Sequence, residues 1–300
     1  MSDTTKDPIQ EATSTGCCGS SSTPDKEERG TVHEAVSEAY GKALERSKST
    51  GASCCGTPSP AGSAARLVDY GEHAEGLPEE AVRSSFGCGN PLAFAEVAPG
   101  EVVLDLGSGA GLDLLIASEK VGPEGRVIGV DMTDEMLAEA AKNIERAGAS
   151  NVELRKGTIE ELPVEDASID WVISNCVINL SPDKDAVFRE VARVLKPGGK
   201  LSVSDIVAED LPDELRNHAA IHAACIGGAI SEGAYVDGLK SAGLGQVDVT
   251  ERQVYDKDQL LSVVAIDEVV AEGLTPEFLE QAAATVEGKV WSARFVAVRD

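Results

Sequence analysis

The sequence predicts an α/β fold built on a doubly wound, mostly parallel β-sheet. From about residue 66 onward, short β-branched runs alternate with amphipathic stretches, and most of these runs are too apolar for strands that face solvent on one side. Such runs are typical of parallel strands covered by helices, and their alternation with helical patterns is typical of β-α-β units. We therefore expect a ligand to bind at the carboxyl ends of the strands.

Five apolar segments are predicted to be successive strands: residues 101–109, 125–132, 151–157, 170–179 and 199–207. Helices are predicted between them, over residues 112–120, 133–148 and 181–199. Thr133 should cap the second helix, and Ser181 should cap the third, with Pro182 as its first residue. Further along, a helix, a strand, two acidic helical segments and a final strand are expected.

The charge balance excludes some classes of partner. The chain has 26 basic and 52 acidic residues, a net charge of −26, which repels phosphate backbones and anionic lipids. No apolar run approaches the roughly 18 residues of a membrane span, and the first residues lack the basic and apolar regions of a signal peptide. We therefore expect a cytoplasmic protein that binds neither nucleic acid nor membrane.

A glycine-rich loop follows the first predicted strand. Asp105 ends the strand, and Gly107, Gly109 and Gly111 let the backbone turn tightly and approach a ligand closely. Asp131 ends the second strand, where a carboxylate can accept both hydrogens of a ribose diol. Because Asp105 adds a negative charge beside the loop, a cationic nucleotide without phosphates suits this site better than a pyrophosphate. S-adenosyl-L-methionine has these properties.

The chain here resembles the class I S-adenosylmethionine methyltransferases. The resemblance covers about residues 66–255 and rests on "DLGSGAG", "GVDMTDEM", "GTIEELPVEDASIDWVIS" and "REVARVLKPGGKLSVSD". It implies a seven-stranded, mostly parallel sheet and particular contacts with the cofactor. The implied contacts are Gly107 and Gly109 beside the methionine moiety, Asp131 and Met132 beside ribose and adenine, and Ile159 and Glu160 flanking adenine.

Cysteines supply the chemistry that the substrate site needs. Their number, seven, is odd, and without a signal peptide it favours reduced thiols over a disulfide framework. Cys88 lies in a glycine-flanked loop, Cys176 ends the fourth predicted strand, and Cys225 precedes paired glycines after the fifth. Cys176 and Cys225 are expected to converge near the cofactor methyl group, with Cys88 folding over them. A three-thiolate cage suits zinc, and it suits trivalent arsenic better.

The cysteine segments resemble a narrower family, the arsenite S-adenosylmethionine methyltransferases. The matching motifs are "SFGCGNP", "ISNCVINLSPDK" and "ACIGGAI". The resemblance implies that Cys176 and Cys225 hold arsenite or its thiol conjugates and that Cys88 joins them for methyl transfer and the linked redox step. It also implies a thiol reductant, glutathione or thioredoxin. A vicinal pair, Cys54 and Cys55, resembles one that captures the metalloid first in prokaryotic relatives.

The predicted organisation has four segments. Residues 1–30 have no apolar period and are expected to form a disordered tail. Residues 31–65 should form a short helical arm, starting at a capping box of Thr31 and Glu34, and the vicinal-cysteine loop. Residues 66–206 should hold the cofactor-binding core, and residues 207–300 the substrate-side helices and last strands of the same domain.

Three other interpretations remain open from the sequence. His218, His222 and Cys225 are spaced to lie on one face of a helix, where they could bind zinc. The acceptor could instead be a small organic molecule, with structural cysteines. The protein could also sequester metalloids without catalysis.

Overall fold

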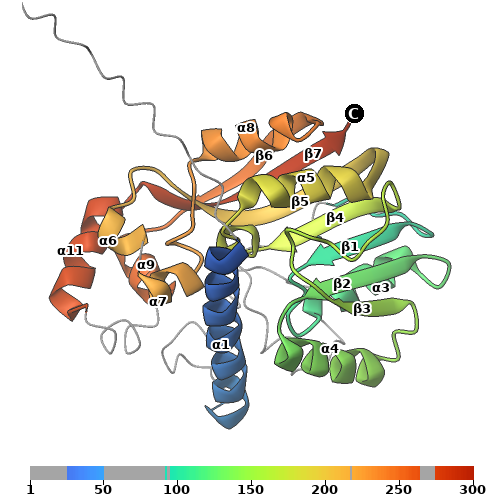
Figure 1. Cartoon of the computed structure of the whole chain (residues 1–300), viewed down its shortest axis with the longest axis horizontal. Coiled ribbons are helices and arrows are strands. Elements are labelled where there is room, and N and C mark those ends of the chain that lie inside the picture. Colours follow the sequence, from blue (N-terminus) through green and yellow to red (C-terminus); the bar gives the residue numbers. More distant parts are fainter. Residues whose placement is uncertain (1–25, 51–91, 93–94, 217, 264–273) are drawn as a thin grey trace, which may run out of the picture.

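A computed structural model describes residues 26–50, 92, 95–216, 218–263 and 274–300 of the chain, and its centre is a seven-stranded sheet (Figure 1). The strand order is β3-β2-β1-β4-β5-β7-β6, and only β7 runs antiparallel to its neighbours. The strands are β1 Val102–Leu106, β2 Arg126–Asp131, β3 Val152–Lys156, β4 Ile169–Asn175, β5 Leu195–Ala208, β6 Leu244–Val254 and β7 Val290–Arg299. The doubly wound, mostly parallel sheet predicted from the sequence is confirmed.

Helices cover the sheet and gather at the carboxyl ends of its parallel strands. Helix α3 packs on β1 and β2, α4 on β3, and α5 and α8 on each other beside β5 and β6. The helices are α1 Lys26–Thr50, α3 Leu112–Val121, α4 Asp134–Ala147, α5 Lys184–Val194, α6 Asp213–Arg216, α7 Ala219–Ala223, α8 Glu232–Ser241, α9 Lys257–Val263 and α11 Pro276–Val286. Within the described ranges, no helix has the length and apolar character needed to cross a membrane.

Two predicted helix starts are wrong. Helix α1 begins at Lys26, inside the segment expected to be a tail, so Thr31 lies within the helix and does not cap it. Helix α5 begins at Lys184, and its N-cap is Asp183, whose carboxylate accepts the N–H of Ala186. The Ser181 hydroxyl instead accepts the N–H of Asp183 and donates to Glu160. Thr133 does precede α4, as expected, although its side chain makes no capping bond.

The core has a main cluster under the sheet and a second one at the carboxyl ends of β4 and β5. The aromatic rings of Tyr235 and Phe295 stack 4.1 Å apart within the first cluster. The second cluster joins Cys176 and Cys225 to Val36 of α1 and to apolar residues of α6, α7, α9 and α11. This second cluster therefore brings sequence-distant elements together around the predicted cysteine site.

Candidate functional site

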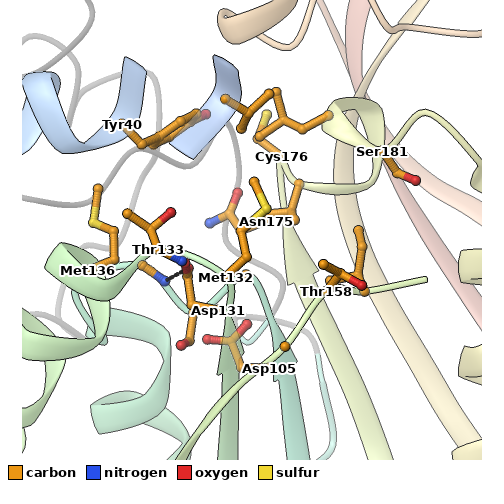
Figure 2. A pocket seen from close by; sticks show the side chains of 18 of the residues that line it. Tyr40, Asp105, Asp131, Met132, Thr133, Met136, Thr158, Asn175, Cys176 and Ser181 are labelled. Atoms are coloured by element: carbon orange, nitrogen blue, oxygen red, sulfur yellow. Dashed lines mark hydrogen bonds between the residues drawn. The ribbon is translucent and has the colours of Figure 1, made fainter. Parts of the chain in front are cut away.

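A pocket opens where β1, β2 and β4 end, at the edge of the sheet that the sequence predicted (Figure 2). It contains about 940 Å³ of empty space, which includes space open to solvent. Helix α1 supplies one wall, through His33, Val36 and Tyr40. All the residues predicted to contact the cofactor line this one pocket: Asp105, Gly107, Gly109, Gly111, Asp131, Met132, Ile159 and Glu160.

The glycine loop is shaped by backbone angles that side chains rarely adopt. Gly107, Gly109 and Gly111 have φ values of 63°, 51° and 91°. A Cβ on Gly107 would lie 2.5 Å from a methyl carbon of Val177, the residue after Cys176. The loop therefore packs directly against the turn that carries the predicted arsenic ligand, and glycine is required for that approach.

Asp131 ties this loop to the end of β2. Its carboxylate accepts the N–H of Gly109 at 2.9 Å and the N–H of Thr133 at 2.8 Å, one bond to each oxygen. Burial raises the pKa of Asp131, although these backbone bonds act against the rise. Each oxygen has lone-pair capacity left for a ligand hydroxyl.

The carboxyl groups of Asp105, Asp113 and Asp131 gather at one wall of the pocket. Burial, together with the charges of Asp113 and Asp131, raises the pKa of Asp105 well above its ordinary value. Asn175, at the end of β4, donates to Asp113 at 3.2 Å and holds that carboxylate at the pocket wall. The lining residues that the structure describes include no lysine or arginine. A ligand that carries its own positive charge would therefore complement this wall.

Two of the predicted cysteines meet beside the pocket. Cys176 directly follows β4 and lines the pocket wall, and Cys225 lies in the turn after α7. The Cys225 thiol donates to the carbonyl oxygen of Cys176 at 2.8 Å, and the Tyr40 hydroxyl lies 3.8 Å from the Cys225 sulfur. The convergence of Cys176 and Cys225 agrees with the sequence prediction. Cys54, Cys55 and Cys88 lie outside the described residues.

Both cysteines adopt a left-handed backbone conformation. Their φ values are 58° at Cys176 and 62° at Cys225, which is uncommon for residues other than glycine. Such conformations cost about 1–3 kcal/mol each and persist where the surrounding structure holds them. The sulfur of Cys176 is disulfide-bonded, so the structure shows an oxidised form of this side chain. The two unfavourable backbone conformations lower the stability of the fold, and they place Cys176 at the pocket wall and Cys225 beside it.

Residues 98–265, more than half of the chain, match a family described as a methyltransferase domain. The chain belongs to the methyltransferase domain family. An arsenite methyltransferase of Halobacterium salinarum is 44% identical over 204 residues, which cover 66% of this chain and 51% of that protein. The Homo sapiens arsenite methyltransferase is 38% identical over 211 residues, covering 66% and 54%. The chain thus spans about half the length of these curated relatives.

A solved structure supports the same family. An arsenic(III) S-adenosylmethionine methyltransferase from Chlamydomonas reinhardtii aligns with a TM-score of 0.58 and 33% identity. The alignment covers 75% of this chain and 70% of that one.

The sequence reasoning missed several residues of this methyltransferase pocket. His33, Tyr40, Asp113 and Ser181 line it but were not predicted to do so. A signal was present for Tyr40, which lies on the apolar stripe of the N-terminal helix together with Val36. That stripe predicts that the helix packs against another part of the protein, and only the structure shows that this part is the pocket.

The alternative zinc arrangement at His218, His222 and Cys225 is not supported by the geometry. Helix α7 ends at Ala223, so Cys225 does not share a helical face with the histidines. The His222 ring donates from Nε2 to the carbonyl of Leu180 at 3.3 Å, and burial lowers its pKa. Across the described ranges, no group of three or more His, Cys, Asp or Glu side chains is placed to hold a metal ion.

A buried polar network fixes the turn after Cys176. The Asn179 amide donates to Asp205 at 2.8 Å and to the carbonyl of Ile206 at 2.6 Å. The Lys184 ammonium donates to the carbonyls of Asn179 and Ser181 at 3.3 and 3.0 Å, and burial lowers its pKa to about 8. These bonds hold the turn between β4 and α5 against the end of β5.

Asp205 should make stability depend on pH. Burial raises its folded pKa to about 7 from the ordinary 3.8 expected in the unfolded chain. The raised pKa means that folding favours the protonated form, so its contribution is full below about pH 4 and is lost as pH rises through 7. Asp205→Asn mimics the protonated acid. We expect the variant to gain stability over wild type between pH 4 and 8, on the order of 2–4 kcal/mol.

Urea unfolding at several pH values measures this difference. Asp210→Asn, which changes an exposed carboxyl nearby, is the control and should track wild type. A constant difference between Asp205→Asn and wild type across this pH range would contradict the prediction.

Proposed function

We propose that this protein is an arsenite methyltransferase that produces methylarsenite and, in a second round, dimethylarsenite. The observation that carries the proposal is the contact between the buried Cys225 thiol and the carbonyl of Cys176, which is also buried and lines the pocket wall. Relatives named as arsenite methyltransferases, and the structural neighbour described as an arsenic(III) methyltransferase, support this substrate.

The pocket suits S-adenosylmethionine as the methyl donor. Gly107 and Gly109 would lie against its methionine moiety, Asp131 would accept its two ribose hydroxyls, and Met132 and Ile159 would contact adenine. The cluster of Asp105, Asp113 and Asp131 favours a ligand that is positively charged. S-adenosylmethionine would supply an electrophilic methyl group on a sulfonium.

The cysteines would hold the acceptor. Each thiol replaces one hydroxide of arsenite: an As–S bond forms, an As–O bond breaks, and the thiol proton leaves with the hydroxide as water. Trivalent arsenic held by thiolates keeps a lone pair that would attack the sulfonium methyl without a general base: an As–C bond would form, the S–CH3 bond would break and S-adenosylhomocysteine would leave. The arsenic would then be pentavalent, and two electrons from a pair of enzyme thiols, which would become a disulfide that the thiol reductant reduces, would return it to the trivalent state. We assign this role to Cys176 and Cys225 and propose Cys88 as the third thiol, with Cys54 and Cys55 as the capture pair.

A thiol reductant belongs to the proposal. Cys176 is disulfide-bonded in this structure, and a cysteine in that form cannot bind arsenite until it is reduced. Glutathione or thioredoxin would restore it. Because this chemistry needs a reducing compartment, we also propose a cytoplasmic location.

Mass spectrometry tests the function directly. The full chain, incubated with S-adenosylmethionine, arsenite and a thiol reductant, should yield methylated arsenic. Reactions that lack the cofactor, the protein or the reductant serve as controls. Wild-type protein that binds S-adenosylhomocysteine but forms no methylated arsenic would contradict the arsenite assignment.

The cofactor half of the proposal predicts the effect of Asp131→Asn. The new amide would turn an NH2 group toward one of two backbone N–H donors and would lose the charge that accepts ribose hydroxyls. Losing charged hydrogen bonds of this kind costs about 1.5–3 kcal/mol, so S-adenosylhomocysteine should bind about 10- to 100-fold more weakly. Calorimetric titration measures this. Asp134→Asn, at an exposed carboxylate paired with Lys156, is the control and should bind as wild type does.

A further inference from the structure

One carboxylate at the pocket wall is only half satisfied. Glu160 has a side chain that is 4% exposed, and its Oε1 lies 3.0 Å from His33 Nε2 and 2.5 Å from the Ser181 hydroxyl. Its other oxygen, Oε2, is buried and accepts no hydrogen bond from any residue that the structure describes. A buried acceptor without a donor is costly and rare. The structure therefore leaves a place in this pocket for a ligand N–H group.

Two donors from different parts of the chain fix this carboxylate. The carboxylate only accepts, so the imidazole of His33 must donate from Nε2, and Ser181 donates to the same oxygen. Burial alone would raise the pKa of Glu160, but these two bonds, together with the charge of His33 and the backbone N–H of Glu160 itself, outweigh it and the pKa is lowered. Glu160 is therefore ionised near neutral pH and offers the ligand an acceptor only.

We propose that His33 is a positioning residue that holds Glu160 so that the pocket selects a purine with a 6-amino group over one with a 6-oxo group. The inference rests on the proposed use of an adenosyl cofactor. With Oε1 saturated by His33 and Ser181, Oε2 is the oxygen left for the purine edge. A 6-amino group donates to it, whereas a 6-oxo group sets two acceptors against each other.

Helix α1, which carries His33, makes a second contact. This contact allows the attachment of the helix to be tested separately from the positioning of Glu160. Arg29 of α1 lies 3.5 Å from Asp183, the N-cap of α5, and this ion pair does not involve Glu160. Substitution of Arg29 therefore weakens the attachment of α1 without removing either donor to Glu160 Oε1. Substitution of His33 affects both.

The experiment compares two ligands on the full chain by calorimetry: S-adenosylhomocysteine and its 6-oxo analogue, S-inosylhomocysteine. Wild type should prefer the amino ligand by at least about 100-fold, as expected for a site built to accept one donor. His33→Ala should reduce this ratio by about 10-fold or more. His33→Gln, which keeps a side-chain donor, should restore most of it.

Control variants show whether His33 positions Glu160 or only attaches helix α1 to the rest of the protein. Arg29→Gln should weaken both ligands alike and leave their ratio unchanged. Ser181→Ala, a second variant that removes a donor to the same oxygen, should lower the ratio as His33→Ala does. An unchanged ratio in both His33→Ala and Ser181→Ala would overturn the inference, even when absolute affinities fall. The proposed function fails separately, when wild type forms no methylated arsenic whatever its ligand ratio.

Discussion

Replacing Cys176 by serine is expected to abolish arsenite methylation and to leave S-adenosylhomocysteine binding within a few-fold of wild type. Cys176 lies at the pocket wall, and its carbonyl receives the Cys225 thiol, so this position joins the two halves of the proposed site. A serine oxygen is a hard ligand and binds trivalent arsenic far more weakly than a thiolate does. We expect the rate to fall by at least about 100-fold, the effect of losing roughly 3 kcal/mol of transition-state stabilisation.

A glycine at the same position separates the effect of losing the thiol from the effect of the strained backbone conformation. Because Cys176 has a φ of 58°, Cys176→Gly relieves an unfavourable conformation while it removes the thiol. With reductant present, so that no disulfide contributes, the relieved backbone strain should offset part of the loss of the buried side chain. The variant should therefore remain folded and still lose methylation. Ser174→Ala, two residues earlier on β4, is the control for disturbance of the strand and should keep activity. Methylated arsenic is measured by mass spectrometry.

Two experimental outcomes would support a different function for this protein. Undiminished methylation by Cys176→Ser would mean that this thiol does not hold the acceptor, as in a methyltransferase for small organic molecules with structural cysteines. Failure of labelled S-adenosylmethionine to bind wild type would instead favour a protein that sequesters metalloids.

The parts of the site that could be predicted are those set by short stretches of chain. The glycine loop and Asp131 follow strand ends, and in a parallel sheet those ends meet at one edge. The same rule placed Cys176 beside them. Each of these predictions needed only a strand boundary and the fold class.

The parts that could not be predicted depend on contacts between distant residues. His33 reaches Glu160 across 127 positions of sequence, and no local pattern indicates where a helix will pack. The start of α5 also depends on a contact with a residue that is distant in the sequence. Ser181 followed by Pro182 is a good local start signal, but the Ser181 hydroxyl accepts the N–H of Asp183 and donates to the distant Glu160, and Asp183 caps the helix.

Replacing Gly228 by alanine is expected to separate the two cysteine-bearing turns. A Cβ at Gly228 would overlap the carbonyl oxygen of Asn179 and lie 3.0 Å from its carbonyl carbon. The obstacle cannot move easily, because Asn179 is fully buried and its amide is bonded to Asp205. The turn that carries Cys225 must therefore shift, which breaks the contact between its thiol and Cys176.

We expect Gly228→Ala to lower stability by about 2–4 kcal/mol, as overpacking against buried backbone does, and to lower methylation by at least about 100-fold. S-adenosylhomocysteine should still bind within a few-fold, since Gly228 does not line the pocket. Gly233→Ala is the matched control. A Cβ at Gly233 meets nothing within 4 Å, and the residue lies in helix α8, where alanine is favoured by up to about 1 kcal/mol.

Urea unfolding, calorimetric ligand titration and the arsenic assay together separate the possible results. Lost methylation with retained ligand binding in Gly228→Ala, beside a fully active Gly233→Ala, would show that the register between the two turns matters for the acceptor and not for the cofactor. Wild-type methylation by Gly228→Ala would mean that Cys225 does not need to be held against Cys176. The cage would then have to assemble around arsenic itself, and the strained backbone at the two cysteines would need another explanation.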